Sequence, residues 1–373
     1  MKILYCIDGT FNSGGMERVI INKANYLAEH GYNVFIITVN QKNRKPFFEI
    51  NSKIQSIDLG INYSDDKDLF FLKKSISFSR KLKQHKKKLK EQIAKIKPDI
   101  IISTFGYESY FLYTIKDSSR KIIEIHFSKF FRLQSNRSGI WHWVDVIKSY
   151  REQQIVKKYD KFVVLTYEDK EYWGNLKNII VIPNFLPSHP EQRAPLTNKK
   201  CIAVGRLDYQ KGFDMLIDIW ANIHKIHPEW ELFIYGNGNL RTNLTNKIQK
   251  YNLQNSVFIK PPTPEIFNAY NESSVLLCSS RFEGLPMVLL EGFSCGLPVV
   301  SFKCKCGPQD LIINGENGYL IEEGNLSEFT KKVIYLIENI EKRKQMGESA
   351  YQTSLKYTSD KIMEKWIKLF NEL

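Results

Sequence analysis

The sequence RFEGLPMVLLEGFSCGLPVV, residues 281–300, combines a strand end, a helix start and two acids, and the rest of the chain is organised around it. The apolar run at residues 275–278, just before it, predicts a buried parallel strand. From Met287 onward the apolar residues recur at helical spacing. We therefore expect Pro286 to open a helix, at a position where its missing N–H group costs nothing.

The two acids flank this expected helix start. Glu283 falls on the loop before the helix, and Glu291 falls about one turn inside it. A helix N-terminus attracts anions, because it presents free backbone N–H groups and the positive end of the helix dipole. A capped helix that carries two solvated acids has the same local pattern. The local pattern alone therefore leaves both interpretations open.

The complete motif resembles the signature of the family-4 retaining glycosyltransferases of the GT-B fold. In that signature an acid, seven residues and a second acid precede a segment like SCGLPVV, residues 294–300. The resemblance implies that Glu283 contacts hydroxyl groups of the donor sugar and that Glu291 holds the nucleotide ribose. It also implies that the donor diphosphate is bound by the residues at the helix start, which are Leu285, Pro286 and Met287.

A second motif, CIAVGRLDYQKG, occupies residues 201–212. We expect a strand that ends near Arg206, a short loop, and a helix that starts after Lys211. Arginine can donate to two phosphate oxygens at once, and lysine adds a mobile positive charge. Isolated surface cations often have no role, but a Gly-Arg and Lys-Gly pair at similar spacing is the diphosphate clamp of this family. The resemblance therefore implies that Arg206 and Lys211 bind the donor diphosphate.

The N-terminal segment shows a third match. A short apolar strand leads into DGTFNSGGMER, residues 8–18, and then into a helical pattern. Glycines let backbone N–H groups approach an anion, although a plain strand-to-helix turn would also use them. The segment is neither a P-loop nor a G-x-G-x-x-G fingerprint, so it does not support a dehydrogenase. It resembles the Gly-Gly-x-Glu-Arg element that, in the family, covers the donor diphosphate and faces the acceptor. The resemblance places Gly14 and Gly15 at the diphosphate, and Gly15, Glu17 and Arg18 on the acceptor side.

His126 ends an apolar segment, residues 121–126, that we expect to be a strand. Ligand sites of open α/β sheets gather at the carboxyl ends of strands. A single histidine at such a position is often structural, but the resemblance implies a residue that positions the donor sugar and the acceptor. A helix is expected over residues 106–115.

A chain of 373 residues is too long for one growing core, so two domains are expected. Residues 187–200 contain three prolines and no apolar period, which predicts a linker. The expected domains are an acceptor-binding domain over residues 1–186 and a nucleotide-sugar-binding domain over residues 201–358. The resemblance implies an α/β GT-B fold of two facing doubly wound, Rossmann-like domains with the active site in the cleft between them. It also implies that a final helix, residues 359–373, packs back onto the first domain.

The composition is that of an ordinary globular protein, with 43% hydrophobic and 25% charged residues. No segment approaches the roughly 20 apolar residues that cross a bilayer, and the first residues read as a strand rather than a signal peptide. We therefore expect a cytoplasmic protein. The six cysteines are expected to be free thiols, and the C-x-C at residues 304–306 is a poor zinc site.

The net charge of +14 is concentrated in one segment, Lys73 to Lys97, where Glu91 is the single acid. A basic helix with a thin apolar stripe is expected there, and it suits peripheral contact with an anionic membrane. A solvated helix face is the alternative. Nucleic acid is not expected as a partner, because no recognised binding motif accompanies the charge. The apolar stripe consists of Phe78, Leu82, Leu89, Ile93 and Ile96.

Together the matches imply a retaining hexosyltransferase that needs no metal or other cofactor. In this interpretation Arg206 and Lys211 neutralise the leaving diphosphate of a nucleotide sugar, which we expect to be UDP-linked, while Glu283 and His126 complete the catalytic set. The acceptor is expected to be a glycan or lipid-linked molecule in polysaccharide, capsule or lipopolysaccharide assembly. Two other classes stay open: a catalytically silent scaffold of the same fold, and a phosphorylase or epimerase on that fold.

Overall fold

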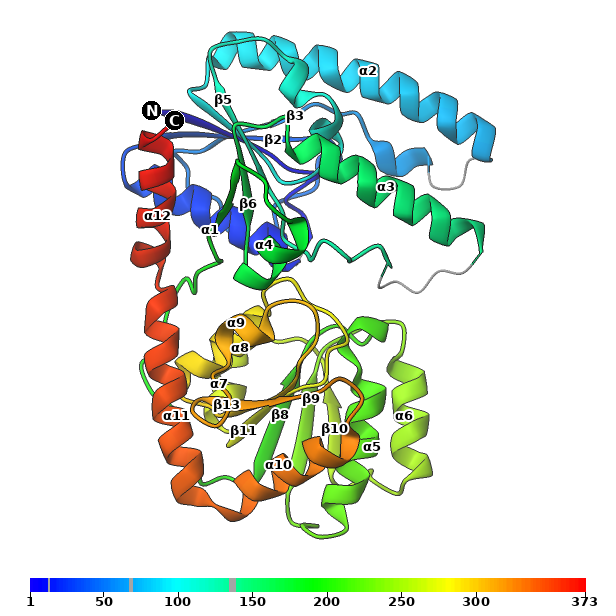
Figure 1. Ribbon diagram of the computed structural model, residues 1–373, viewed down its shortest axis with the longest axis vertical. Coiled ribbons are helices and arrows are strands. Elements are labelled where there is room, and N and C mark those ends of the chain that lie inside the picture. The colour runs from blue at the N-terminus through cyan, green and yellow to red at the C-terminus, as the bar shows by residue number, and fades with distance from the viewer. Residues whose placement is uncertain (13, 67–69, 134–138) are drawn as a thin grey trace. The chain divides into compact units, whose positions relative to one another are not determined.

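A computed structural model of the chain describes residues 1–12, 14–66, 70–133 and 139–373. The chain divides into two compact units, each built on its own sheet (Figure 1). Unit 1 comprises Met1–Leu165, Lys170–Ile182 and Ile362–Leu373. Unit 2 comprises Thr166–Asp169 and Pro183–Lys361, so residues 187–200 lie within unit 2.

Within the described part of unit 1, seven parallel strands form a sheet in the order β3-β2-β1-β4-β5-β6-β7. Most of their residues are buried, as is typical of parallel strands that helices cover on both faces. The strands are β1 (Lys2–Cys6), β2 (Asn33–Thr38), β3 (Gln55–Asp58), β4 (Ile100–Ser103), β5 (Arg120–Glu124), β6 (Lys161–Val164) and β7 (Ile179–Val181).

The helices of unit 1 include the last one in the chain. Residues 362–371 of that helix belong to unit 1 although they follow unit 2 in the sequence. Its buried side chains recur at helical spacing, so one face of the helix packs against the unit. The helices are α1 (Gly15–Glu29), α2 (Phe71–Ile96), α3 (Ile140–Val156), α4 (Tyr167–Trp173) and α12 (Ser359–Asn371). Helix α4 belongs to unit 1 from residue 170 onward.

Unit 2 contains a second sheet, in which six described strands are all parallel in the order β10-β9-β8-β11-β12-β13. The strands are β8 (Lys200–Val204), β9 (Glu231–Tyr235), β10 (Val257–Lys260), β11 (Val275–Cys278), β12 (Val299–Phe302) and β13 (Gly318–Ile321). The helices are α5 (Phe213–His224), α6 (Arg241–Lys250), α7 (Ile266–Asn271), α8 (Met287–Ser294), α9 (Pro308–Leu311), α10 (Leu326–Glu338) and α11 (Ile340–Ser354).

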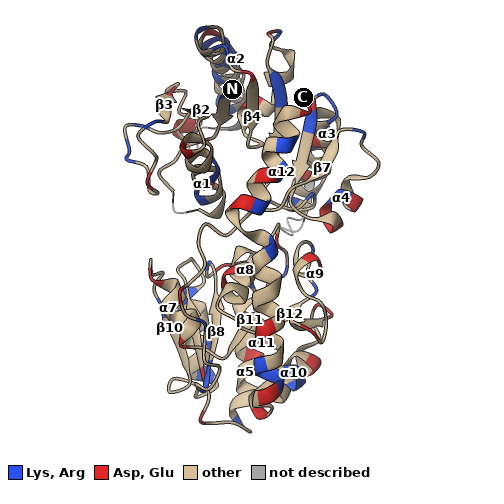
Figure 2. Ribbon diagram, turned by 90° about the vertical axis from the view of Figure 1, so that its left-hand side faces the viewer, with Lys and Arg blue, Asp and Glu red and all other residues tan. Residues whose placement is uncertain are grey.

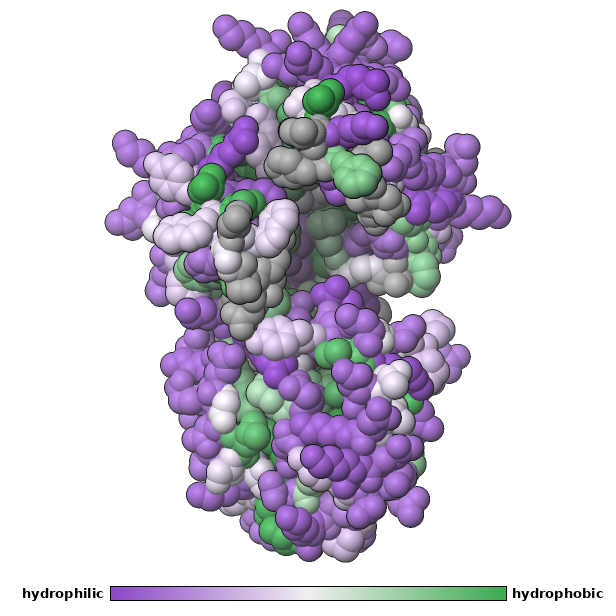
Figure 3. Space-filling model, turned by 90° about the vertical axis from the view of Figure 1, so that its right-hand side faces the viewer, coloured by the Kyte–Doolittle hydropathy of each residue, from purple (hydrophilic) through white to green (hydrophobic). Residues whose placement is uncertain are grey.

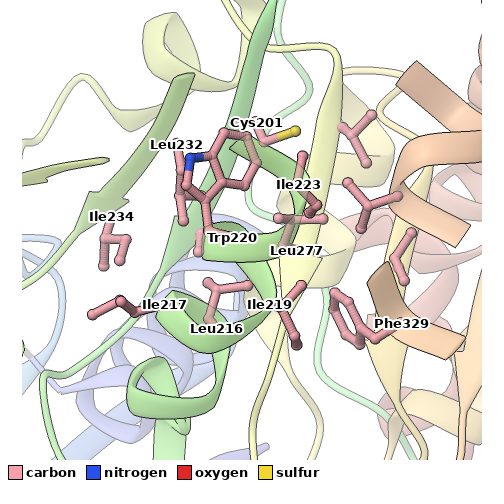
Figure 4. Packing of buried hydrophobic residues seen from close by; sticks show 14 of the residues in the cluster. Cys201, Leu216, Ile217, Ile219, Trp220, Ile223, Leu232, Ile234, Leu277 and Phe329 are labelled. Carbon is pink, nitrogen blue, oxygen red and sulfur yellow. The ribbon is translucent and has the colours of Figure 1, made fainter. Parts of the chain in front are cut away.

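The core of unit 2 is centred on Trp220 of α5, whose side chain is fully buried. Figure 4 shows the indole ring among aliphatic side chains from α5 and from strands β9 and β11, beside the Cys201 thiol of β8. Burying an aromatic side chain of this size removes more apolar surface from water than any aliphatic residue can. The packing therefore fixes α5, and with it the loop that leads into the helix, against the sheet.

Both sheets reverse their strand order at one point, between β1 and β4 in unit 1 and between β8 and β11 in unit 2. In open α/β sheets the loops after the strands diverge at such a point and leave a crevice for a ligand. The predicted GT-B type of fold, with two Rossmann-like α/β domains, is confirmed.

Three local expectations need correction. The segment 106–115 forms two short 3-10 turns, Tyr107–Tyr110 and Leu112–Thr114, instead of an α-helix. Helix α8 begins at Met287, so Pro286 is its N-cap residue and not its first helical residue. The strand expected to end at His126 ends at Glu124.

The apolar stripe of α2 faces the interior. Leu89, Ile93 and Ile96 are buried in the core of unit 1 and Leu82 packs against that core, so these residues are not available to a membrane. Phe78, at the other end of the stripe, is 37% exposed. The lysines and arginines of α2 are mostly exposed (Figure 2). Among the described residues, no helix is both long and apolar enough to span a bilayer.

Candidate functional site

The loops that follow β8 and β11 bring Lys211 and Glu283 together at the point where the strand order of unit 2 reverses. The Lys211 ammonium lies 2.6 Å from the Glu283 carboxylate, measured from Nζ to Oε1. The side chains are 13% and 7% exposed, respectively. Two residues that the sequence assigned to the same site, 72 positions apart, are thus in direct contact.

Hydrogen bonds hold this ion pair in place. The Ser280 hydroxyl donates to Glu283 Oε1 over 2.6 Å, and the Glu283 N–H donates to the carbonyl of Lys305 over 2.8 Å. Burial alone would lower the pKa of Lys211, but the Glu283 carboxylate more than compensates and the pKa is raised above its ordinary value. Lys211 is therefore fully charged at neutral pH.

Gly212 lets the loop after β8 approach the end of β11. Its φ is +62°, in the left-handed region that favours glycine, and a Cβ atom there would collide with the carbonyl oxygen of Ser279. The Ser279 hydroxyl donates to the Lys211 carbonyl over 2.9 Å. The close backbone contact thus positions the Lys211 side chain over the strand ends.

Arg206 lies on the same loop, and its side chain is 71% exposed. The guanidinium donates to Gln210 Oε1 over 2.9 Å and lies 3.3 Å from the Asp208 carboxylate. Gln210 in turn donates to the Phe282 carbonyl over 2.9 Å, so Arg206 is connected to the Glu283 loop through one side chain. The arrangement leaves Arg206 accessible to a ligand.

Helix α8 carries the remaining candidates of unit 2. Leu285, Pro286 and Met287 lie directly before and at its first turn, as the sequence predicts. Glu291 is buried one turn further on, where it accepts a hydrogen bond of 3.0 Å from the Tyr270 hydroxyl. The structure thus gathers the helix start, Glu283 and Lys211 at one edge of the sheet.

Sequence reasoning missed several supporting residues here. Arg281 makes two hydrogen bonds to the Asp214 carboxylate, of 2.9 and 2.6 Å, which tie the loop after β11 to the first turn of α5. Ser280 and Tyr270 were missed as well. Ser280 lies two residues beyond the end of β11, which is a usable signal, but the distant partners Asp214 and Tyr270 have none.

In unit 1, His126 lies two residues beyond the end of β5, and its side chain is only 4% exposed. Its Nε2 atom is 3.6 Å from the carboxylate of Glu124, and neither ring nitrogen has a hydrogen-bond partner in the described part of the chain. Burial alone would raise the pKa of Glu124, but Lys23, and then His126, hold it below its ordinary value. His126 therefore borders a buried ion pair, between Lys23 and Glu124, and its two ring nitrogens are buried without a hydrogen-bond partner among the described residues.

Gly14, Gly15, Glu17 and Arg18 form the N-cap and first turn of α1, after β1. Gly14 has an ordinary φ of −70°, and a Cβ atom there would collide with the Glu17 carboxylate. That carboxylate accepts a hydrogen bond of 3.2 Å from the side chain of Asn12. Gly14 therefore gives room to Glu17, which folds back over the helix start. Ser13, within the same predicted motif, lies outside the described residues.

The comparisons with known families cover nearly the whole chain in two halves. Residues 13–188 match the model described as Glycosyltransferase Family 4. Residues 186–353 match the model described as Glycosyl transferases group 1. The junction of the two matches falls close to Pro183, where the main part of unit 2 begins.

One curated relative aligns end to end. The amylovoran biosynthesis glycosyltransferase AmsD of Erwinia amylovora is 31% identical over 99% of this chain and 99% of its own length. Two solved structures share the fold at lower identity. TarM of S. aureus, in complex with Fondaparinux, alpha-GlcNAc-glycerol and UDP, superposes with a TM-score of 0.78 at 18% identity over 99% of both chains. The apo form of the lipopolysaccharide outer core galactosyltransferase WaaB gives 0.75 at 20% identity over 100% of both chains.

Proposed function

Because the chain belongs to the family-4 glycosyltransferases of the GT-B fold, we propose that it is a retaining enzyme with a nucleotide-sugar donor. It moves a hexose or N-acetylhexosamine from that donor to a glycan or lipid-linked acceptor in surface polysaccharide assembly. The relative AmsD, named for amylovoran biosynthesis, supports the assignment to polysaccharide assembly.

The observation that carries this proposal is the contact between Lys211 and Glu283. The pair places a charged ammonium and a carboxylate side by side at the crevice of the sheet in unit 2. The ammonium suits the donor diphosphate, and the carboxylate suits the hydroxyl groups of the attached sugar. Without a donor, each side chain neutralises the other. With a donor bound, the Lys211 ammonium also donates a hydrogen bond to a phosphate oxygen.

The chemistry follows from these charges. The bond between the anomeric carbon and the diphosphate breaks, and Arg206 and Lys211 stabilise the negative charge that collects on the leaving oxygen. The acceptor hydroxyl attacks the same face of the sugar, and its proton passes to the departing phosphate oxygen. A new glycosidic bond forms with retained configuration. Since two side-chain cations offset the leaving charge, the reaction as proposed needs no metal ion.

The donor is proposed to be UDP-linked. TarM, which shares this fold, has been solved with UDP bound. Glu291 holds the ribose, and the start of α8 at Leu285, Pro286 and Met287 binds phosphate oxygens through backbone N–H groups. Contacts to the base are not assigned, because the loop after β10 carries the run PPTP, residues 261–264, in place of the glycine-containing loop usual in the family.

The acceptor side is assigned to unit 1. Gly15, Glu17 and Arg18 lie at the start of α1, and His126 lies beyond β5. We assign His126 a positioning role, in which an unpartnered ring nitrogen binds a sugar hydroxyl. The exposed cations of Lys73 to Lys97 add electrostatic attraction for an anionic acceptor or membrane.

A screen of nucleotide sugars tests the proposal. The full-length chain is incubated with UDP-, GDP- and ADP-sugars in the presence of a metal chelator, and melting temperature and slow nucleotide release are measured. We expect stabilisation by one UDP-sugar, with release of UDP. A chain that neither gains stability from any nucleotide sugar nor releases nucleotide would be a silent scaffold, and the proposal would be wrong.

A further inference from the structure

Unit 1 contains a pocket of about 800 Å³ at the point where its strand order reverses. Asp8, after β1, and the segment Phe105–Tyr110, after β4, form its floor. Helices α2 and α3 flank it, with Lys74 and Phe78 on one side and Arg151 on the other. Its position and volume are those of a small-molecule site in an open α/β sheet.

The lining combines aromatic rings with positive charge. The rings are those of Phe78, Phe105, Tyr107, Tyr110, Phe127 and Phe131. Flat rings of this kind pack against apolar surfaces, including the carbon faces of sugars and the first carbons of a lipid chain.

Four cations line the pocket: Lys74, Arg132, Lys148 and Arg151. Arg132 is neutralised, because it donates two hydrogen bonds to Glu152, of 2.9 and 2.6 Å. Lys148 and Arg151 are exposed on α3, and neither has an ion-pair partner among the described residues. Arg151 lies over the ring of Tyr110, 5.1 Å from its centroid. Two cations at the mouth are therefore available to a phosphate group.

The acids of the pocket oppose these cations only in part. Burial raises the pKa of Glu108 to about 7, so this carboxyl group carries only part of a negative charge at neutral pH. Its Oε1 atom accepts hydrogen bonds from the Ser103 hydroxyl, over 2.6 Å, and from the Gly106 N–H, over 3.2 Å. Asp8 accepts a hydrogen bond of 2.5 Å from the side chain of Asn40. The pocket mouth thus keeps an excess of positive charge.

The outer face of α3 is unusually apolar for an exposed helix. Trp143, Ile147 and Tyr150 are 68%, 64% and 65% exposed, and their spacing of four and three residues places them on one face. Figure 3 shows pale and green side chains among the purple ones on the face that it turns to the viewer. Tryptophan and tyrosine are the residues that settle at the boundary between a bilayer and water.

Helix α2, on the other side of the pocket, presents the complementary feature. Exposed lysines and arginines recur along α2 at steps of three, four and seven residues: Lys73, Arg80, Lys83, Lys87 and Lys90. The stripe suits anionic headgroups, while Leu89, Ile93 and Ile96 of α2 are used by the core. Ile76, near the start of the helix, is 72% exposed and adds apolar surface beside the charges. The two helices therefore offer different features to a membrane: α2 presents positive charge to the headgroups, and α3 presents apolar side chains that can insert into the bilayer.

We propose that the pocket of unit 1 binds the phosphate-bearing head of a lipid-linked acceptor, and that α3 inserts Trp143, Ile147 and Tyr150 into an anionic bilayer at the pocket mouth. The inference rests on the proposed transferase function and names the acceptor class. Lys148 and Arg151 bind the phosphate, and the aromatic rings bind the groups attached to it. The insertion of α3 brings the mouth to the depth at which lipid phosphates lie.

Vesicle flotation of the full-length chain tests the insertion. Vesicles of phosphatidylcholine are compared with vesicles that also contain phosphatidylglycerol. We expect binding to the anionic vesicles, and a loss of about ten-fold or more in partitioning when Trp143, Ile147 and Tyr150 are all changed to serine. The three side chains are exposed, so the variant should fold like the parent, which circular dichroism checks.

A matched control removes apolar surface from unit 2. Ile226→Ser combined with Tyr335→Ser changes two exposed side chains that the proposal does not use. This control should bind vesicles like the wild type. Equal binding by the α3 variant and the wild type would overturn the insertion, as would an equal loss in the control.

The phosphate site of the pocket is tested by comparing binding to two kinds of vesicle with equal surface charge. One contains phosphatidic acid, whose phosphomonoester is exposed, and the other contains phosphatidylglycerol. We expect a preference for phosphatidic acid that disappears in a variant with Lys148→Gln and Arg151→Gln. The control, with Lys87→Gln and Lys90→Gln, loses the same charge from α2, and it should bind both lipids more weakly while keeping the preference. A wild type without the preference would overturn the phosphate site.

Two further outcomes separate the possible failures. If soluble glycerol-phosphate oligomers bind the wild type and the α3 variant equally and displace both from vesicles, the pocket serves a soluble polyanion and the lipid proposal is wrong. Nucleotide release from a UDP-sugar without vesicles reports the transferase function by itself. A chain that releases UDP but ignores vesicles overturns only the present inference.

Discussion

At the residue scale, the pair of Lys211 and Glu283 has a large energetic consequence at the candidate donor site. Both side chains are largely removed from water, and one partner left alone at such a site costs several kcal/mol. The pairing therefore keeps both side chains ionised at a site with little access to water, where a single charge would be unfavourable. Ligand binding can exploit this arrangement, because a diphosphate and a sugar hydroxyl satisfy the same two groups.

Removal of either partner is expected to disable the donor site. Lys211→Ala, Glu283→Ala and Arg206→Ala should each lower turnover by on the order of 100-fold or more, since each removes a group that stabilises or orients the reacting diphosphate sugar. Initial rates of nucleotide release, with saturating donor, give the measurement.

The control for this series is Lys344→Ala. It breaks another ion pair of unit 2, in which Lys344 lies 3.5 Å from Glu341 within helix α11. Turnover should stay within about two-fold of the wild type, because pairs of this kind contribute little. Full activity in both Arg206→Ala and Lys211→Ala would show that the diphosphate clamp is wrongly assigned.

Glu108 makes a prediction about pH. Its pKa in the folded state is about 7, above the ordinary value of 4.5, because the carboxyl group is buried. The folded chain thus binds the proton more tightly than the unfolded chain does. The resulting stability is fully present below about pH 4.5 and is lost as the pH rises through about 7.

The substitution Glu108→Gln should abolish this loss, since glutamine does not ionise. We expect the free energy of unfolding of the variant, relative to the wild type, to rise by about 2 to 3 kcal/mol between pH 4.5 and pH 8. Urea unfolding at both pH values measures it. Glu91→Gln, on the exposed face of α2, serves as the control. A difference that does not change with pH would mean that Glu108 ionises normally.

At the scale of elements, the loops at the reversal point of each sheet carry the site, and glycines set how closely they approach. Gly212 brings the loop after β8 against the end of β11, and Gly236 lets the loop after β9 lie against the carbonyl of Gly205. These contacts are between backbone atoms, so no change of side-chain rotamer can relieve a collision. The geometry of the donor site therefore depends on residues that never touch the donor.

Gly212→Ala tests this dependence. The new Cβ atom meets the Ser279 carbonyl, and the φ of +62° is unfavourable for alanine. We expect a loss of about 2 to 4 kcal/mol in the free energy of unfolding of unit 2, together with weaker nucleotide binding. Gly324→Ala is the matched control: its φ is +80° but a Cβ atom there meets nothing, so it should cost only about 1 to 2 kcal/mol. Equal costs would mean that the contact with Ser279 is unimportant.

The strands and the donor loops were predictable because their signals are local. The run at residues 275–278 has the composition of a buried strand, and the motif after it places Glu283 on a loop whatever the rest of the chain does. The contact between Glu283 and Lys211 needed the family resemblance as well, since spacing alone does not bring two distant loops together. The partners of these loops, such as Asp214 for Arg281, depend on tertiary contacts that no local pattern encodes.

Two failures of prediction have physical causes. The apolar period of α2 identifies a stripe but does not tell a core from a membrane, and Leu89 and Ile93 turn out to be core residues. The segment 106–115 has a helical pattern, yet the Glu108 side chain folds back to accept bonds from Gly106 and Ser103. Such local side-chain bonds compete with the hydrogen bonds of an α-helix.

At the scale of the whole molecule, the end of the chain completes the unit in which the chain begins. Trp366 of α12 is buried in unit 1, and the ammonium of Lys23 lies over its ring, 4.4 Å from the centroid. Lys23 is itself buried and paired with Glu124, so the Trp366 ring covers a charged pair as well as apolar surface. Each unit has a separate core, which means that damage at α12 should be confined to unit 1.

A chain that stops after Lys361 tests this arrangement. It loses α12 and exposes the ion pair of Lys23 and Glu124 to water, so we expect unit 1 to become sensitive to protease and to unfold at a lower temperature. Unit 2 keeps its complete core, and UDP should still protect it.

Where the truncated chain does not accumulate, Trp366→Ala and Trp366→Phe replace it. The alanine variant should lose about 3 to 5 kcal/mol from unit 1 and the phenylalanine variant clearly less, because a ring is retained over Lys23. Equal stability of the truncated and full-length chains would show that α12 contributes nothing to unit 1, and a loss of UDP protection would show that the two units do not fold as separate cores.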